Sequence, residues 1–312
     1  MGQVLILGLI AGGISALFAV GVVLVYRGTG VLTFAGGEIG AVSLYTAALL
    51  VEHGVPYAVA AVLAVAVATV LGLVFEVLVV RVMREADPVT VSVATVGLTF
   101  LLLSTEILVF GSSPKVLTNP FHASVTVFGV VLRAHQVLAV LLSLGLGFGL
   151  QAVLRRTDFG LGILAAAQDP AAVRLVGVPL SQISLVLWGG GAALAGIAAL
   201  LVEPTVGVIT PGYASELYVS GLAAAVIGGL TSLPGAVIGG VVLGVAQAAA
   251  SRLAQGHIVP GLSYLVSLGL VLAVLLGRTV LPELRRRLTP PAPPASSTPG
   301  PTATDSTLLV TS

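Results

Sequence analysis

The residues of this sequence most able to do chemistry are glutamates that lie inside or beside long apolar stretches. Glu38 follows two glycines within the stretch at 33–48, and Glu76 and Glu106 lie within one or two turns of the ends of other apolar segments. A carboxylate within lipid costs roughly 3 kcal/mol on insertion scales unless it faces a cavity or a partner. The three positions therefore indicate polar sites inside an apolar protein.

Two arrangements fit the glycines that precede Glu38. In the first, the glycines let a helix break, and the freed backbone groups line a polar translocation path together with the carboxylate. In the second, Glu38 stands at a helix N-terminus near the membrane interface and is stabilised by the helix dipole. The residues alone leave both arrangements open.

The sequence predicts that this chain is not an enzyme and binds no cofactor. Its single lysine, Lys115, follows Pro114, so no P-loop is possible and ATP must be hydrolysed on another polypeptide. Cysteine is absent and no Gly-x-Ser-x-Gly motif occurs. No two histidines have the i, i+4 spacing of a helical metal site, so we expect that the chain binds no metal ion. We expect the four histidines to be solvated at membrane boundaries; they are His53, His122, His135 and His257.

Composition places most of the chain in lipid. Of 312 residues, 57% are hydrophobic and 8% charged, against about 25% charged in a typical soluble domain. We expect an all-α polytopic bundle of about eight or nine spans, some of them short, Gly-rich and broken or re-entrant. The predicted segments are 4–25, 36–51, 56–80, 89–110, 135–154, 183–202, 214–230, 234–251 and 258–277.

The basic residues predict the orientation. Alternating nine segments across a bilayer puts Lys115, Arg133 and Arg252 on one side and the other ten on the opposite side, which are Arg27, Arg81, Arg84, Arg155, Arg156, Arg174, Arg278, Arg285, Arg286 and Arg287. By the positive-inside rule the richer side is cytoplasmic. We therefore expect a multi-pass protein of a prokaryotic cytoplasmic membrane, with its N-terminus outside and its C-terminus in the cytoplasm.

The end of the chain differs in composition from the rest. Residues 289–312 are rich in Pro, Ser and Thr, which predicts a disordered cytoplasmic tail after a transmembrane domain at 1–288. The arginines at 285–287 are expected to lie against lipid headgroups. A net charge of +1 gives no field that would attract nucleic acid.

The longest predicted cytoplasmic loop, at 155–182, has helical character. Asp169 and Pro170 are typical of a helix start and Gly177 of a helix end, and three alanines at 165–167 favour a helix before them. Two short helices here would form a knob on which a partner protein can dock. An interfacial connector without a partner is the alternative.

Glycines recur in the stretch at 221–244. Gly235 and Gly239 satisfy Gly-x-x-x-Gly, which lets helices approach closely, and Leu233-Pro234-Gly235 predicts a tight turn. The members expected to act in helix packing or gating are Gly228, Gly229, Pro234, Gly235, Gly239 and Gly240.

Taken together, these stretches resemble the branched-chain amino-acid permease family of ABC importers over roughly residues 8–277. Residues 34–38, Phe-Ala-Gly-Gly-Glu, are similar to the family's Phe-Ala-x-Gly-Glu motif, and 228–240 is similar to its Gly-rich signature. The resemblance implies a translocation path at Phe34, Gly36, Gly37 and Glu38. It also implies that the 155–182 loop couples to an ATPase, with matching positions at Gly160, Asp169, Arg174 and Gly177.

The family resemblance also implies partners and a substrate class. It implies a second related permease or a homodimer, two cytoplasmic ATPases, an external binding protein and surrounding lipid. The implied solute is a branched-chain or other hydrophobic amino acid, or a related small molecule such as urea or an amide. It would be moved by alternating access. An ion-coupled secondary carrier is the alternative, favoured by the glutamates in or near spans.

Two departures from the family pattern bear on these expectations. Members commonly carry several arginines early in the loop, where this chain has Asp158, Leu161 and Leu164. Members often have His before the Gly-Glu pair, where Gly36 stands here. The first departure concerns the ATPase contact and the second concerns the solute.

Overall fold

The computed structural model describes residues 2–117, 124–127, 130–168, 173, 179–254 and 261–288. The chain divides into two compact units, 1–274 and 275–312. The predicted tail at 289–312 lies outside the described residues.

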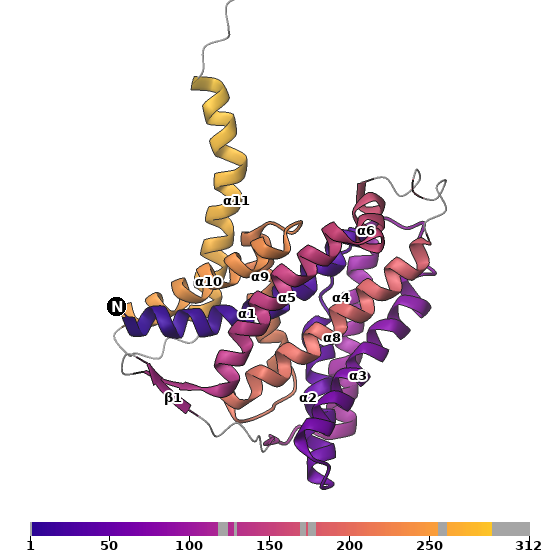
Figure 1. Ribbon diagram of the computed structural model, residues 1–312, viewed down its shortest axis with the longest axis vertical. Coiled ribbons are helices and arrows are strands. Elements are labelled where there is room, and N and C mark those ends of the chain that lie inside the picture. Colours follow the sequence, from indigo (N-terminus) through magenta and orange to yellow (C-terminus); the bar gives the residue numbers. More distant parts are fainter. Residues whose placement is uncertain are drawn as a thin grey trace, which may run out of the picture. The chain divides into compact units, whose positions relative to one another are not determined.

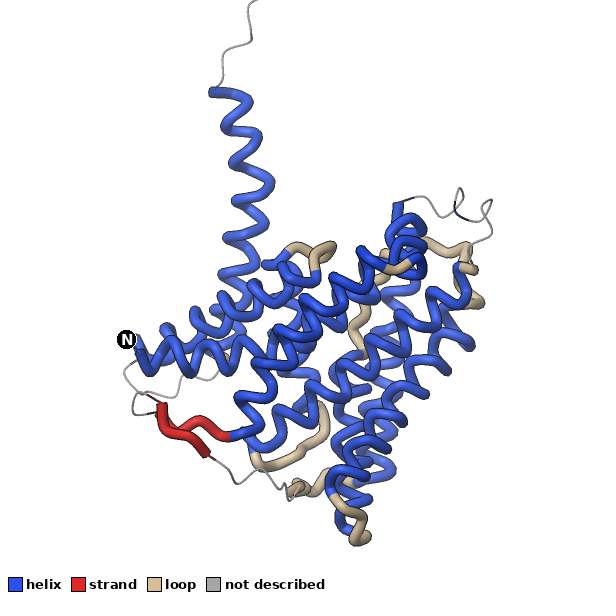
Figure 2. The backbone as a smooth tube through the Cα atoms, viewed as in Figure 1, coloured by secondary structure: helices blue, strands red, loops and turns tan. Residues whose placement is uncertain are grey.

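Helices dominate the described chain, as Figure 2 shows. They are α1 (Gly2–Thr29), α2 (Gly36–Glu52), α3 (Tyr57–Phe75) with the π-helix η1 (Glu76–Val80), α4 (Pro88–Phe110), α5 (Ala134–Arg156), α6 (Asp158–Gln168), α8 (Leu180–Val206), α9 (Tyr213–Gly228), α10 (Leu233–Leu253) and α11 (Leu262–Leu288). A helix corresponds to each of the nine predicted apolar segments. The predicted polytopic helical bundle is therefore confirmed.

Six of the described helical segments are long and apolar enough to cross a membrane. They are Gly8–Thr29, Tyr57–Val80, Pro88–Phe110, Ala134–Arg156, Leu180–Pro204 and Leu233–Leu253. Shorter apolar helices occur at Tyr213–Gly228 and Tyr264–Arg278. Helix α2, with 17 residues, is also shorter than these six segments.

A short β-hairpin between α4 and α5 was not expected from an all-α prediction. Strand β1 (Ser124–Val127) pairs antiparallel with β2 (Val130–Arg133), so that Ser124 lies opposite Arg133. The two strands are rich in valine, whose branched Cβ favours extended backbone. Four-residue strands are too short to stand out from the apolar segments around them.

Helix α1 is the centre of the described bundle. Helices α5, α6, α8, α9 and α10 all pack against it, and Figure 1 shows α10 running alongside its N-terminal half. Because neighbours cover it on several sides, its side chains from the second turn onward are almost all buried. A helix that is apolar on every face is the kind that can occupy such a central position.

Glycines bring the backbones of α1 and α10 together. A Cβ on Gly12 would lie 2.6 Å from the carbonyl oxygen of Gly240, and one on Gly8 would lie 2.6 Å from the Cα of Val245. A Cβ on Gly244 would overlap the backbone of both Gly8 and Gly12. Each helix therefore contributes a pair of glycines four residues apart, which is the arrangement that permits close packing of helices in membranes.

Small residues also join α3 to α8. Ala60, Ala64 and Ala68 recur every four residues on α3 and are fully buried. One turn further, a Cβ on Gly72 would lie 2.7 Å from the carbonyl oxygen of Trp188 in α8. The repeat of four places these residues on one face, so the backbones of the two helices lie close together.

The turn before α10 differs from the prediction. The predicted turn at Leu233-Pro234-Gly235 is wrong, because Leu233 and Pro234 already belong to the first turn of α10. The chain reverses just before them, beginning at Gly229, whose φ of 81° favours glycine. Ser232 then caps α10 by accepting a hydrogen bond from the Gly235 N–H at 3.1 Å, and proline is tolerated within a first helical turn.

The packing of α1 on α10 predicts a strong effect of Gly244→Ala. The added methyl group would overlap backbone atoms of α1, which cannot move aside as a flexible side chain can. Overpacking of this kind costs about 1–3 kcal/mol. We expect the free energy of unfolding in detergent or lipid to fall by that amount, measured by thermal or denaturant unfolding.

Gly149→Ala is the matched control for that variant. Gly149 is an exposed glycine of α5, and a Cβ built there meets no atom within 4 Å. Its substitution should leave stability unchanged or raise it slightly, because alanine favours helix. Equal effects of the two substitutions would contradict the importance of close packing between α1 and α10.

Candidate functional site

The segment between α1 and α2 is held by side chains of two other helices. Ser92 and Thr95 of α4 accept hydrogen bonds from the backbone N–H groups of Leu32 and Phe34, at 3.0 and 2.9 Å. The hydroxyl of Tyr218 in α9 donates to the carbonyl of Thr33 at 2.9 Å. Backbone groups that have no helical partner are thus satisfied by α4 and α9, which fixes the point where α2 begins.

Glycines let α9 approach the first turn of α2. A Cβ on Gly36 would overlap the ring of Tyr218, and one on Gly37 would lie 2.7 Å from the Cα of Ser215. Larger residues at either position would push α2 away from α9. The Gly-Gly pair is therefore required by the packing of these two helices, and Phe34 lies just before it, partly exposed.

Glu38 lies in the first turn of α2 and is 1% exposed. Its carboxylate oxygen Oε1 accepts a short hydrogen bond from the hydroxyl of Ser215 in α9. Helix α2 is continuous from Gly36 to Glu52, so Glu38 stands at a helix start, where the dipole favours a negative charge. The structure shows no break within α2, and it buries Glu38 among helices instead of leaving it exposed at a surface.

A second carboxyl group lies beside Glu38. Glu106 of α4 is fully buried, and its carboxyl group interacts with that of Glu38. The hydroxyl of Tyr45, also fully buried, lies within electrostatic reach of both, and the Tyr45 ring stacks on Phe110 with centroids 4.7 Å apart. The sequence placed Glu106 near the end of a span, but nothing in its spacing indicated that it would meet Glu38.

The cavity at the start of α2 is small. A cavity of about 20 Å³ is lined by Gly36 and Ile39 of α2, Tyr218 of α9 and residues of α1 and α8. That volume holds roughly one water molecule. The described conformation is therefore closed where α2 packs against α9.

The third of these glutamates, Glu76, follows the C-terminal end of α3. Glu76 is fully buried at the start of η1, and its oxygens lie 3.5 Å from Arg81 and 3.4 Å from Arg84. The π-helical turn ends at Val80, directly before the first of these arginines. Glu76 is thus neutralised by two partly exposed cations, which distinguishes it from Glu38 and Glu106.

Several helix ends meet around a cavity of about 380 Å³ near these arginines. Its lining includes Gly28 of α1, Arg84, Pro88 of α4, Ala166 of α6 and Leu180 of α8. The C-terminal ends of α1 and η1 and the N-terminal ends of α4 and α8 therefore lie at one end of the bundle.

The predicted coupling loop begins with helix α6. Gly160 is buried in it, because a Cβ there would lie 2.6 Å from the carbonyl oxygen of Leu154 in α5. On the outer side, Phe159 and Leu161 are 43% and 50% exposed. Asp169, Arg174 and Gly177 lie outside the described residues, as does the predicted second helix.

The predicted packing glycines lie between α9, α10 and α1. Cβ atoms on Gly228 and Gly235 would each overlap the other's backbone, and one on Gly239 would lie 2.7 Å from the N of Gly228. Gly240 points the other way, where a Cβ would lie 2.7 Å from the carbonyl oxygen of Gly12. Gly229 ends α9, and Pro234 opens α10.

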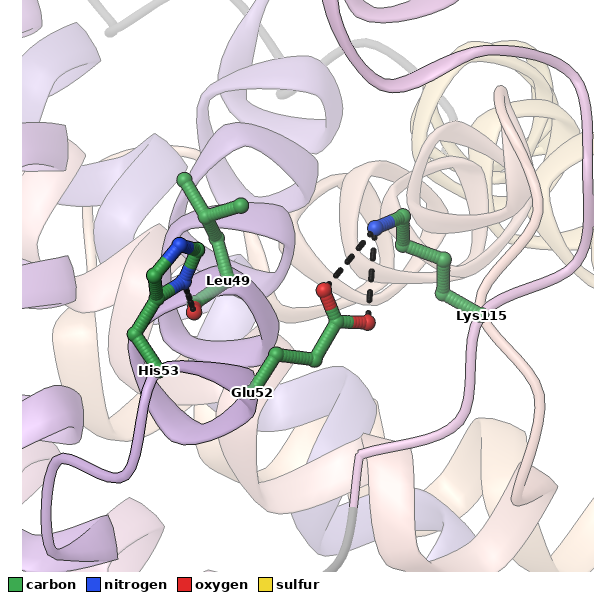
Figure 3. Close-up of polar contacts among 4 residues, drawn as sticks. All are labelled: Leu49, Glu52, His53 and Lys115. Atoms are coloured by element: carbon green, nitrogen blue, oxygen red, sulfur yellow. Dashed lines mark hydrogen bonds and ion pairs between the residues drawn. The ribbon is translucent and has the colours of Figure 1, made fainter.

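Lys115 lies at the opposite end of α2 from Glu38. Figure 3 shows its ammonium group facing the carboxylate of Glu52, with Nζ 3.4 and 3.3 Å from the two oxygens. The backbone of Lys115 also pairs with that of Ile209, which follows α8. One residue thus joins the C-terminal end of α2 to the segments that follow α4 and α8.

Two of the four histidines, which were expected to be solvated at membrane boundaries, lie within the described residues. His53 is exposed, and its Nδ1 lies 2.8 Å from the carbonyl oxygen of Leu49 (Figure 3). His135 is fully buried in the first turn of α5, so the prediction is wrong for it. Burial depends on the neighbouring helices and not only on distance from a segment end. Among the described residues, no three His, Asp or Glu side chains form a group that could hold a metal ion.

The described helices form a polytopic bundle with six segments able to cross a membrane. Residues 4–275 match the model of the family described as the branched-chain amino acid transport system permease component. The chain belongs to this family. It is a transport permease and not an enzyme, and the match favours the importer over the ion-coupled carrier.

Curated relatives cover nearly the whole chain. The high-affinity branched-chain amino acid transport system permease protein BraD of Pseudomonas aeruginosa is 31% identical over 88% of this chain and 93% of its own length. The corresponding protein LivH of Escherichia coli is 28% identical over 86% and 91%. A probable LivH of Methanocaldococcus jannaschii is 30% identical over 88% and 91%.

A solved structure shares the fold. PsaBC from Streptococcus pneumoniae, in complex with a Fab, contains a chain that matches with a TM-score of 0.50. The alignment covers 90% of this chain and 94% of the other at 13% sequence identity. At that identity the likeness concerns the fold alone.

The hydrogen bond between Ser215 and Glu38 predicts the effect of Ser215→Ala. The substitution leaves a buried carboxylate oxygen without its donor, which costs about 1–3 kcal/mol. We expect the midpoint of thermal unfolding to fall accordingly. Ser104→Ala is the control, since that exposed hydroxyl bonds only within α4, to Phe100. A loss of stability in the control as large as that in Ser215→Ala would contradict the prediction.

Proposed function

We propose that this chain is the membrane-spanning subunit of an ATP-driven importer that takes up branched-chain or other hydrophobic amino acids. The relatives are transport-system permeases for branched-chain amino acids over nearly the full length of the chain, and this match carries the proposal. A solute-binding protein outside the cell would deliver the amino acid, and two ATPases in the cytoplasm would drive alternating access. A second permease, related or identical, would complete the path.

The translocation path is proposed to include the start of α2. Phe34 is partly exposed there, Gly36 and Gly37 bring α2 against α9, and Glu38 is buried beside Ser215. Opening a path here requires α2 and α9 to separate, since the adjoining cavity holds about 20 Å³. Separation would expose the carboxylate of Glu38 to an entering solute, whose ammonium group it can attract.

The orientation is proposed from the charges. The helix ends near the cavity lined by Gly28, Arg84 and Ala166 carry Arg27, Arg81, Arg84, Arg155 and Arg156, and the positive-inside rule supports a cytoplasmic position for them. The N-terminus is then outside, and the pair formed by Glu52 and Lys115 faces the external side. Helix α6 lies on the cytoplasmic side, where an ATPase can reach it.

Helix α6 is proposed to dock on the ATPase through Phe159 and Leu161. Both are large apolar residues exposed on a short helix next to the charged end of the bundle. Gly160 between them keeps α6 against α5, so it acts through the position of the helix and not through contact with the partner. Asp169, Arg174 and Gly177 complete the proposed coupling element on the strength of the family motif.

We expect Glu38→Gln to reduce ATP-driven uptake about tenfold or more while the complex still assembles. The amide keeps the size and a hydrogen bond with Ser215 but removes the negative charge on the proposed path. Uptake of labelled leucine into proteoliposomes containing ATP measures the effect. Glu85→Gln, at an exposed position beyond η1, is the control. Unchanged uptake by Glu38→Gln would show that the charge does not serve transport.

A second expected outcome concerns docking. Phe159→Glu should abolish co-purification of the ATPase, because it puts a charge in an apolar contact. Gln168→Glu, exposed at the end of the same helix, adds the same charge outside that contact and should retain the ATPase. If the ATPase stays bound to Phe159→Glu, the docking surface lies elsewhere.

A further inference from the structure

Two carboxyl groups are buried together where α2, α4 and α9 meet. Glu38 is 1% exposed and Glu106 is not exposed at all, and their carboxyl groups interact. In the part of the chain that the structure describes, neither forms an ion pair, whereas Glu76 has two arginines and Glu52 has Lys115. The pair therefore has no protein cation to balance its charge among these residues.

The hydrogen bonds around the pair are incomplete. Oε1 of Glu38 accepts from Ser215, but Oε2 of Glu38 and both oxygens of Glu106 have no donor among the described residues. The hydroxyl of Tyr45 is buried, has no described hydrogen-bond partner and lies in electrostatic reach of both carboxyl groups. A buried polar atom without a partner costs about 1–3 kcal/mol, so four such atoms in one place point to a missing proton or ligand.

The other elements packed on α2 bring mainly small apolar groups to it. Against α8, the atoms nearest to a Cβ on Gly40 would be the carbonyl group of Ala195 and the methyl group of Ala199. The fully buried face of α3 consists of alanines at 60, 64 and 68. Helix α9 contributes Ser215 and, one turn on, Tyr218, whose hydroxyl donates to Thr33. Helix α8 carries a further buried carboxyl group near its C-terminal end, Glu203, which is 2% exposed and forms no ion pair among the described residues.

We propose that Glu38 and Glu106 form a proton-binding site that retains one proton in the closed conformation. Glu106 carries the proton, because Glu38 already has a donor in Ser215 and a helix N-terminus to stabilise its negative charge. The proton is donated to Oε2 of Glu38. The carbonyl oxygen left on Glu106 is the acceptor for which the hydroxyl of Tyr45 is available.

A proton needs no cavity, because it is shared between carboxyl groups that already interact. The cavity of about 20 Å³ at the start of α2 is lined by Gly36 and Ile39, and neither Glu38 nor Glu106 is among its lining residues. The proposed site therefore belongs to the closed conformation, whichever solute the protein moves.

Loss of the proton would place two negative charges side by side in a low-dielectric interior, where their repulsion is far stronger than in water. The proton therefore holds α2 and α4 together, and its departure favours their separation. Energy for transport still comes from ATP; the proton controls how readily the closed bundle opens.

Glu106→Gln tests the proposal, because an amide N–H can permanently supply the hydrogen bond that the proton supplies. The complete complex in lipid would be studied by infrared spectroscopy, in which a protonated carboxyl group absorbs separately from a carboxylate. We expect a protonated-carboxyl band at neutral pH in the wild type and in Glu85→Gln, and a weaker band in Glu106→Gln, where only other buried carboxyl groups such as Glu203 can still contribute. A wild type without the band, or a band unchanged in Glu106→Gln, would overturn the proposal.

Stability against pH gives a second measurement. With Glu106 protonated, this site binds one more proton in the folded protein than in the unfolded chain, so its contribution to stability falls as pH rises from about 4.3, where a free glutamate titrates, through neutrality. Glu106→Gln should remove that contribution and leave only the dependence due to other buried groups such as Glu203, and Glu85→Gln should keep the full dependence. The same pH dependence in all three proteins would also overturn the proposal. Neither measurement uses transport, so failure here is distinguishable from failure of the proposed function.

Discussion

The close approach of the α1 backbone to its neighbours is the constraint on which the other helices depend. In lipid there is no hydrophobic gain from covering one apolar helix with another, so association requires tight packing and hydrogen bonds between helices. Glycines provide the packing at Gly12 and Gly240, and again where α9 meets α10 at Gly228 and Gly235. With α1 held in this way, α8 and α9 carry α2 and its buried glutamate into position.

Carboxylates at the two ends of the bundle form ion pairs, one of them buried and the other exposed. Glu76 is matched by two arginines at the end that we assign to the cytoplasm, and Glu52 by Lys115 at the other. Glu38 lies between these ends without a cation among the described side chains. A buried carboxyl group without a cation raises the free energy of the folded protein. Glu38 lies where α2, α4 and α9 meet, so this energetic cost falls on the part of the fold that has to open.

Much of the fold could be predicted from the sequence, because length and hydropathy alone identify apolar helices. A helix corresponds to each of the nine predicted segments, and Gly36 and Gly37 were recognisable as a place where helices could approach. The hairpin at 124–133 was missed because short valine-rich strands resemble the surrounding apolar sequence. The turn before α10 was placed too late, since proline fits a first helical turn as well as a reverse turn.

The candidate site was predictable only in part. Glu38 stood out through its glycines, but its pairing with Glu106 joins residues on different helices and leaves no local pattern. Ser215 and Tyr45 carry no signal at all, since serine and tyrosine are ordinary in such segments. Interactions of this kind arise from tertiary packing, which one sequence does not reveal.

The bridge at Lys115 has a practical consequence. The sequence contains one lysine and no cysteine, and that lysine joins the end of α2 to the segment after α8. Apart from any terminal amine, an amine-reactive fluorophore would therefore modify one side chain of this sequence, at a junction between three segments. Single cysteines introduced elsewhere could carry a second dye without competing sites, so distances across the bundle become measurable during turnover.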